Sequence, residues 1–132
     1  MPSKKRIILI ADDDSDDVEI LTEVFNQLDD HMSIHTVQNG GQVFRYLAGL
    51  ADDDLPCVMV LDYKMPILNA AEVLEKIRND ERYSRIPKVV WSTSGRQEDM
   101  NRCLDAGAKE YFIKPSKTSE LKRMAGIMLQ YC

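Results

Sequence analysis

Four apolar residues lead directly into a single carboxylate near the middle of the chain, over Val58 to Asp62. An unbroken apolar run of this length predicts a strand that is buried on both faces, as in a parallel sheet. Pro66 follows shortly afterwards and ends the regular structure. Ligands of open α/β sheets bind beyond the carboxyl ends of the strands, so Asp62 is expected at a position where chemistry takes place.

Other strand-like segments alternate with amphipathic helical patterns along the whole chain. The further strands are expected at residues 7–11, 33–37, 86–91 and 110–113, and Asn69 is expected to cap the helix after the central strand. About five alternations of strand and helix predict an α/β fold, in which a doubly wound parallel sheet carries helices on both faces.

Length and composition favour a single compact unit without a membrane segment. We expect residues 1–132 to form one domain, with no separate output domain because only three residues follow Leu129. The net charge is −5 and the only basic cluster is Lys4 to Arg6, which disfavours nucleic-acid binding. No apolar run approaches the roughly 20 residues of a membrane span and no signal-peptide pattern is present, so we expect a cytoplasmic protein.

The three cysteines are Cys57, Cys103 and Cys132. Their odd number and the lack of CxxC spacing favour neither a disulfide framework nor a zinc site. Cys57 and Cys103 are interpreted as small buried hydrophobic residues, and Cys132 as an exposed thiol at the chain end.

Polar side chains follow four of the predicted strands. They are Asp12 and Asp13 after the first strand, Asp62 at the end of the third, Ser92 after the fourth and Lys114 after the fifth. Right-handed crossovers place the carboxyl ends of parallel strands at one edge of the sheet. We therefore expect three carboxylates, a hydroxyl and an ammonium group to meet at one rim.

The acidic run after the first strand continues beyond Asp12 and Asp13 with three further carboxylates. Asp14, Asp16 and Asp17 stand where the first helix begins. Carboxylates at a helix N-terminus usually cap it and compensate its dipole. We interpret these three residues in that way.

Three carboxylates in one cleft repel one another. At about 4–5 Å and an effective dielectric constant near 20, each pair costs roughly 3–4 kcal/mol. Such a cluster is expected to hold a proton or to bind a cation, and oxygen ligands without a dedicated cage suit Mg²⁺. With Lys114 and Ser92 alongside, Asp62 is a candidate nucleophile toward an incoming phosphoryl group.

The ordered set of these residues resembles the receiver domain of two-component response regulators, over residues 5–129. The resemblance implies the single-domain chemotaxis-type fold, flavodoxin-like with strand order 2-1-3-4-5. Asp12 and Asp13 match the metal-binding acidic pair of that family, and Asp62 in Leu-Asp-Tyr-Lys-Met-Pro matches its phosphoacceptor. The backbone carbonyl of Lys64 takes the position that completes the shell of Mg²⁺, or of Mn²⁺ in its place.

The same resemblance implies roles for residues on the last two strands. Ser92 matches the hydroxyl that binds the phosphoryl group, and Lys114 matches the phosphate-binding lysine. Tyr111 occupies the aromatic switch position, at which the side chain turns inward when Ser92 moves toward the phosphoryl group. The peptide bond from Lys114 to Pro115 is usually cis in this family.

One departure from the family pattern concerns the loop after the phosphoacceptor. The turn that usually reads Asp-Gly or Asn-Gly is Asn69-Ala70 here. Alanine lacks the ease of glycine at positive φ, so we expect a different turn shape or modest strain at Ala70.

The resemblance implies a stand-alone receiver in a phosphorelay. A sensor histidine kinase or phosphotransfer protein would phosphorylate Asp62, the domain would assist its own phosphorylation and dephosphorylation without being an enzyme, and a downstream protein would receive the signal. A homodimer through the fourth helix, fifth strand and fifth helix belongs to the same expectation. The alternative is a binding scaffold of the same fold that works without phosphorylation. A dehalogenase-like phosphatase is disfavoured, because Lys64 stands where that family needs a second carboxylate.

Overall fold

The computed structural model describes residues 6–132 of the chain. Its five strands form one parallel sheet in the order β2-β1-β3-β4-β5. The strands are β1 (Ile7–Ala11), β2 (Ser33–Val37), β3 (Val58–Asp62), β4 (Lys88–Ser92) and β5 (Glu110–Ile113). The predicted sheet and its flavodoxin-like order are confirmed.

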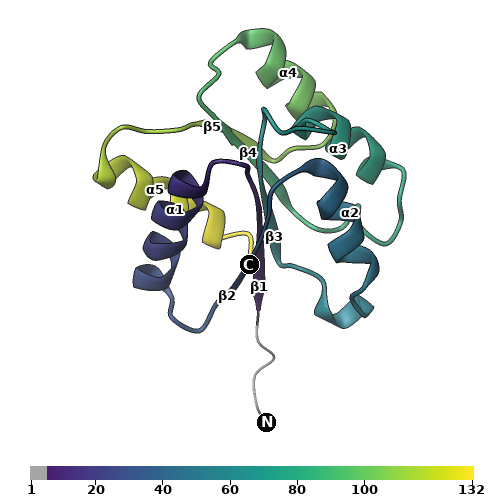
Figure 1. The fold of residues 1–132 in the computed structure, drawn as a ribbon, viewed down its shortest axis with the longest axis horizontal. Helices are drawn as coiled ribbons and strands as arrows, with labels where there is room; N and C mark the ends of the chain where they lie inside the picture. Colours follow the sequence, from purple (N-terminus) through teal and green to yellow (C-terminus); the bar gives the residue numbers. More distant parts are fainter. Residues whose placement is uncertain (1–5) are drawn as a thin grey trace.

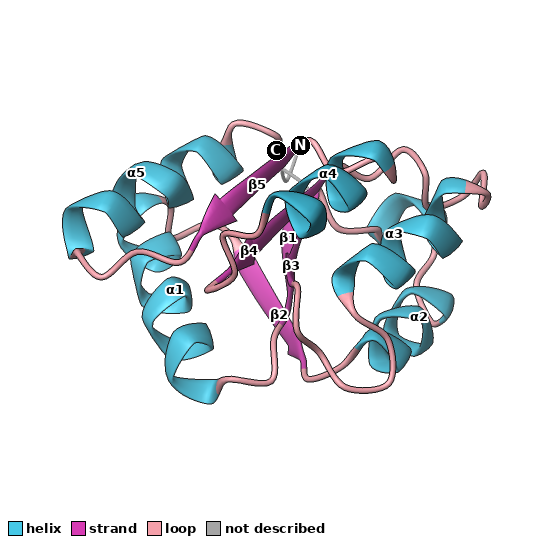
Figure 2. Ribbon diagram, turned by 90° about the horizontal axis from the view of Figure 1, so that it is seen from above, coloured by secondary structure: helices cyan, strands magenta, loops and turns pink. Residues whose placement is uncertain are grey.

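A helix follows each strand. The helices are α1 (Ser15–Leu28), α2 (Gly40–Ala48), α3 (Ala70–Arg78), α4 (Gln97–Asp105) and α5 (Thr118–Leu129), and a short 3₁₀ helix (Asp52–Asp54) precedes β3. Helices α1 and α5 cover one face of the sheet, while α2, α3 and α4 cover the other (Figures 1 and 2). All strands therefore point their carboxyl ends to one edge, as the crossover rule requires.

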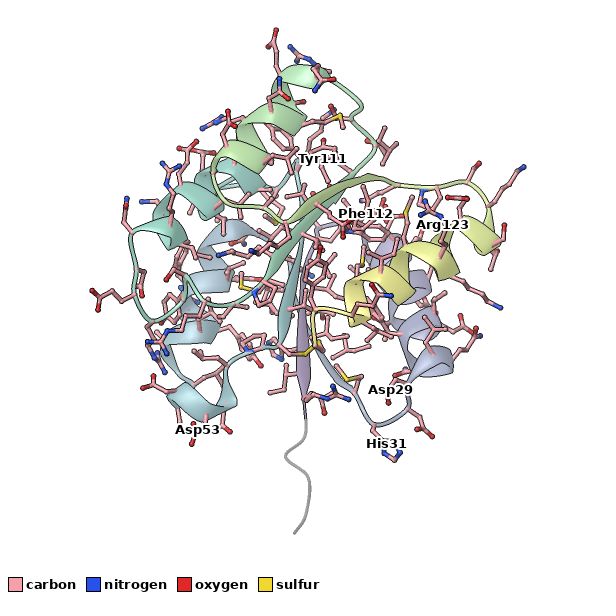
Figure 3. All side chains as sticks on the ribbon, turned by 180° about the vertical axis from the view of Figure 1, so that it is seen from behind. Asp29, His31, Asp53, Tyr111, Phe112 and Arg123 are labelled. Atoms are coloured by element: carbon pink, nitrogen blue, oxygen red, sulfur yellow. A yellow bond between two sulfur atoms is a disulfide. The ribbon has the colours of Figure 1, made fainter. Side chains whose placement is uncertain are left out.

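The two faces of the sheet carry separate apolar cores, because side chains alternate along each strand. Leu9, Met59 and Leu61 pack toward α2 and α3, whereas Ile8 and Val60 pack toward α1 and α5. All five residues of β3 are buried, as the central apolar run predicts. On β5 the alternation places the side chains of Tyr111 and Phe112 on opposite sides of the strand (Figure 3).

Side-chain caps start three of the helices. Asp14 accepts hydrogen bonds from two backbone N–H groups of α1, and Asn39 accepts one in α2. Asn69 forms a capping box with Glu72 at the start of α3, which confirms the predicted cap. These caps hold the loops that join the strand ends to the helices.

Two sequence-based expectations about covalent geometry are wrong. Cys57 and Cys132 form a disulfide, with their Cα atoms 4.9 Å apart. The sequence does not reveal this pairing, because it joins the residue before β3 to the chain end and leaves no local spacing pattern.

The peptide bond from Lys114 to Pro115 is trans, as are all peptide bonds of residues 6–132. The trans form is the intrinsically favoured one, and Lys114 reaches the rim without the cis form.

Other apolar side chains lie where the sequence suggests. Trp91 is buried in the same apolar core as Met124 and Met128 of α5. Within residues 6–132, no helix combines the length and apolar character needed to cross a membrane.

Candidate functional site

Three carboxylates meet at the carboxyl edge of the sheet. Asp12, Asp13 and Asp62 each offer an oxygen atom, and these atoms all lie within 4.8 Å of one another. Asp12 and Asp62 are buried, whereas Asp13 is exposed. The structure thus brings together the three acidic residues that the strand ends predicted.

The ends of β1 and β3 position this cluster. The backbone N–H of Asp12 donates to the carbonyl of Val37, which extends the ladder between β1 and β2. One carboxylate oxygen of Asp12 accepts a hydrogen bond from the backbone N–H of Asp14 at 2.9 Å. Its other oxygen is buried, accepts no hydrogen bond from residues 6–132, and forms an ion pair with the ammonium group of Lys114. Asp12 is therefore held rigidly at the rim.

Lys114 reaches this cluster from the loop after β5. Its Nζ atom lies 2.9 Å from Asp12 Oδ2, 2.8 Å from Asp17 Oδ2 and 3.6 Å from Asp62 Oδ1. Burial by itself lowers the pKa of Lys114, but contacts with Asp17, Asp12 and Asp62 outweigh burial and raise it. The ammonium group therefore stays charged at the centre of the site.

The carboxyl group of Asp62 has a perturbed pKa. Burial raises its pKa to about 7, the negative charge of Asp12 adds to the increase, and the positive charge of Lys114 opposes it. A buried carboxylate with a specific charge partner in a rim of polar groups is typical of functional sites. Near neutral pH both its protonated form and its nucleophilic carboxylate form are therefore populated.

A network of hydroxyl groups lies beyond the end of β4. Ser92 is fully buried, and its Oγ accepts a hydrogen bond from the backbone N–H of Ser94 at 3.0 Å. The hydroxyl of Ser94 donates to Asp99 on α4 at 2.8 Å. Its carbonyl accepts a hydrogen bond from the Tyr111 hydroxyl at 2.8 Å. Ser94 thus connects Ser92 with both α4 and β5.

The loop after Asp62 contains the position of backbone strain, though not where the sequence suggested. Ala70 is the first residue of α3 and is fully buried. Ile67, which is 75% exposed, has φ of 73°, and it is the one non-glycine residue with positive φ among residues 6–132. Ala70 lies inside the helix that the capping box at Asn69 starts, and the residue with positive φ lies three positions earlier. Lys64 is exposed in this loop, two residues after Asp62.

The sequence-based interpretation missed the role of Asp17 at the rim. We interpreted Asp17 as a helix-dipole residue, but its carboxylate contacts Lys114. The signal that could have revealed it is its place in the first turn of a helix that starts beside the cluster. Asp14 and Asp16 behave as expected, since Asp14 is the cap and Asp16 is exposed.

The donor set at the rim fits a hard divalent cation. Mg²⁺ and Mn²⁺ prefer oxygen ligands, and three carboxylates supply them within one small volume. A cation there would also offset the repulsion among the buried charges.

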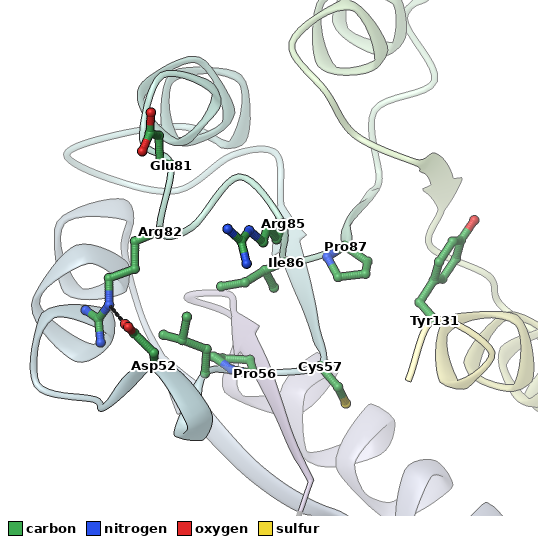
Figure 4. Close-up of a pocket in the computed structure, with 10 residues that line it drawn as sticks. Asp52, Pro56, Cys57, Glu81, Arg82, Arg85, Ile86, Pro87 and Tyr131 are labelled. Atoms are coloured by element: carbon green, nitrogen blue, oxygen red, sulfur yellow. Dashed lines mark hydrogen bonds and ion pairs between the residues drawn. The ribbon is translucent and has the colours of Figure 1, made fainter.

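A larger cavity of about 650 Å³ lies at the opposite end of the sheet, between the loop before β3 and the chain end. Apolar residues and two arginines line it, together with Cys57 and Tyr131, and Arg82 pairs there with Asp52 (Figure 4). It contains no group of three potential metal ligands within residues 6–132. The candidate site is therefore the rim and not this cavity.

The chain matches known protein sequences over most of its length. A family model described as the response regulator receiver domain matches residues 8–125. The two-component response regulator ORR5 of Oryza sativa subsp. japonica is 27% identical over 123 residues, which cover 93% of this chain and 88% of that protein. Chemotaxis protein CheY1 of Helicobacter pylori is 26% identical over 122 residues, which cover 92% of this chain and 95% of that protein.

Solved structures agree with the observed topology. The phosphorylated cyanobacterial phytochrome response regulator RcpA has a TM-score of 0.86 at 26% identity, and the match covers 98% of this chain and 97% of that chain. The Mn(2+)-bound form of response regulator Rcp1 has a TM-score of 0.81 at 24% identity, covering 92% and 91% of the two chains. The second likeness supports the fold alone.

Proposed function

Because the chain belongs to the response regulator receiver domain family, we propose that it accepts a phosphoryl group on Asp62 and passes a signal by protein contacts. The observation that carries this proposal is the position of Asp62 among Asp12, Asp13 and Lys114. That arrangement pairs a nucleophilic carboxylate with a fixed cation and with oxygen ligands for a metal.

The phosphoryl group would come from a phosphohistidine of a sensor kinase or phosphotransfer protein. A carboxylate oxygen of Asp62 forms a bond with phosphorus while the P–N bond breaks, and the bonding electrons remain on the imidazole. Lys114 and the hydroxyl of Ser92 stabilise the negative charge on the phosphoryl oxygens. The domain supplies positioning and charge stabilisation, as phosphoryl transfer generally requires.

Asp12, Asp13 and Asp62 are the side chains that would hold Mg²⁺ or Mn²⁺, with the backbone carbonyl of Lys64 as a further ligand. When bound, the ion neutralises the carboxylates and attracts the phosphoryl oxygens. Asp12 is already buried and oriented by the N–H of Asp14, so the ligand oxygen needs little reorganisation.

The signal would leave through the hydroxyl network at the end of β4. Phosphorylation adds about 1.5–2 negative charges at the rim, which attracts the hydroxyl of Ser92. Ser92 would then give up the hydrogen bond that its Oγ accepts from the N–H of Ser94. Ser94 in turn donates a hydrogen bond to Asp99 and accepts one from Tyr111. Movement of Ser92 therefore reaches β5 and α4, the surface through which a downstream protein would read the state.

Reaction with a small phosphodonor tests the proposal. We expect the wild-type protein to gain the mass of one phosphoryl group with acetyl phosphate and Mg²⁺, and to gain none in EDTA. Asp62→Asn should gain none, whereas Asp16→Asn, exposed on the same edge, should react like the wild type. An unmodified wild type, or a modified Asp62→Asn, contradicts the proposal.

A beryllofluoride titration separates this function from that of a phosphorylation-independent scaffold. Beryllofluoride with Mg²⁺ stands in for the phosphoryl group on Asp62. Binding should change the emission of Trp91, because the Nζ atom of Lys114 lies 4.8 Å from the centroid of its ring. A scaffold that works without phosphorylation would show no change.

A further inference from the structure

Lys114 is held by a residue outside the proposed metal and phosphoryl ligands. Its Nζ atom lies 2.8 Å from Asp17 Oδ2, the shortest of its three carboxylate contacts. The two residues are 97 positions apart in the chain, and Asp17 comes from the first turn of α1. This contact therefore joins α1 to the loop after β5.

The geometry of the ammonium group favours Asp17 over the phosphoacceptor. An ammonium group has three N–H donors. Asp12 and Asp17 lie at 2.9 and 2.8 Å, whereas Asp62 lies at 3.6 Å, beyond a normal hydrogen-bond length. Lys114 is thus drawn toward α1 and away from Oδ1 of Asp62.

We propose that Asp17 is a positioning residue that competes with the phosphoryl group on Asp62 for the ammonium group of Lys114. It thereby lowers the affinity of this domain for the phosphoryl group and for its analogues. This inference rests on the proposed phosphoacceptor function and deepens it.

Asp17 is better suited to this role than Asp12. The side chain of Asp12 is fully buried and is tied to the N–H of Asp14. The side chain of Asp17 is 32% exposed, so it can release Lys114 and turn to water. Partly exposed ion pairs are weak, because water solvates the charges when the pair separates. A phosphoryl group can therefore displace Asp17 from Lys114 at a modest cost in free energy.

Asp16 provides a matched control within the same turn. The backbone N–H groups of Asp16 and Asp17 both donate to Asp14 Oδ1, at 3.0 and 3.1 Å. Both carboxylates follow the same helix cap, but only Asp17 contacts Lys114. Substitution of either by asparagine removes one negative charge from the same helix turn.

The test compares the affinity for beryllofluoride at saturating Mg²⁺, read from Trp91 emission or calorimetry. Asp17→Asn should bind about three- to fivefold more tightly than the wild type, the upper part of the range expected for loss of a partly exposed ion pair. Asp16→Asn should stay within about twofold of the wild type, in line with a solvated charge. Asp17→Glu should restore weaker binding, because it returns the charge.

Three results would overturn the inference: Asp17→Asn binding like Asp16→Asn, Asp17→Asn binding more weakly than the wild type, or Asp17→Glu failing to restore the wild-type affinity. Urea unfolding of each variant checks that the compared proteins are folded. If the wild type itself does not bind beryllofluoride, the proposed phosphoacceptor function fails as well. That outcome is distinct from binding that is merely insensitive to Asp17.

Discussion

The ammonium nitrogen of Lys114 lies 3.6 Å from Oδ1 of Asp62, and both side chains are more than nine-tenths buried. The separation is too long for a hydrogen bond, and Lys114 is shared with Asp12 and Asp17. One cation therefore serves three carboxylates, which leaves Asp62 incompletely neutralised. Its burial and the charge of Asp12 consequently raise its pKa to about 7.

The raised pKa of Asp62 predicts a pH dependence of stability in the absence of divalent cations. An unfolded aspartate titrates near pH 3.9, whereas folded Asp62 titrates at about 7. Between these values the folded state holds a proton that the unfolded state has lost, so the free energy of unfolding falls as the pH rises through this window. Asp62→Asn should be more stable than the wild type above pH 7 by roughly 1–3 kcal/mol.

Urea unfolding in EDTA at about pH 4 and pH 8 measures this effect. The higher free energy of unfolding of Asp62→Asn should disappear at the lower pH, where the carboxyl group of Asp62 is protonated in the folded wild type. Asp16→Asn is the control, and we expect it to follow the wild type at both values. Equal stability of Asp62→Asn and the wild type at the higher pH would contradict the prediction.

The disulfide between Cys57 and Cys132 should stabilise the fold against unfolding. It joins residues 75 positions apart, and closing a loop of that size restricts the unfolded chain. Reduction should lower the free energy of unfolding by about 2–4 kcal/mol, measured in urea with and without a phosphine reductant. The double variant Cys57→Ser, Cys132→Ser should show no response to the reductant; a wild type that is equally stable in both conditions would argue against the bridge.

Cys103 should be a poorly reactive thiol in the folded protein. It lies on α4 and is fully buried, and this burial raises its pKa to about 12. Because the thiolate is the reactive form, alkylation by iodoacetamide at about pH 8 should be slow until the chain unfolds. Intact-mass measurement without reductant should then show one added group in denaturant. Rapid labelling of the folded protein, or three labelled thiols without reductant, would refute this expectation.

Two glycines at helical positions should respond oppositely to alanine. A Cβ atom at Gly40 would lie 2.5 Å from the Cβ of Leu68 and 2.6 Å from its carbonyl, so Gly40→Ala should cost about 1–3 kcal/mol. A Cβ atom at Gly126 in α5 meets nothing within 4 Å, so Gly126→Ala should add about 0.5–1 kcal/mol through helix propensity. Thermal or urea unfolding distinguishes the two, and a shift of the same sign in both would be inconsistent with these contacts.

Ile67 offers a test of the strain in the loop after β3. A β-branched residue at φ of 73° is a rare conformation, and this side chain is 75% exposed. Ile67→Gly should raise the free energy of unfolding by about 0.5–1 kcal/mol, because relief of strain exceeds the entropy lost on folding a glycine. Ile67→Ala retains a Cβ atom and should bring no such gain. The idea fails if glycine and alanine have the same effect in urea unfolding.

The order of the strands and helices was predictable because each element carries its own periodicity. The unbroken apolar run of β3 indicated a strand buried on both faces, and it has that burial. Asn69 indicated the start of α3, and its capping box is present. Once the strands are parallel, the crossover rule alone brings Asp12, Asp62 and Lys114 to the same edge.

The contacts that depend on how distant elements turn toward each other were not predictable in the same way. The sequence by itself determined the fold class and the acidic rim, since both follow from local patterns and from the direction of the chain. Only the tertiary structure decided that Asp17 meets Lys114, that Cys57 pairs with Cys132, and that the strained residue is Ile67 and not Ala70. Each of these depends on the rotation of a helix, the course of a chain end or the path of a loop, and packing across the whole domain sets all three.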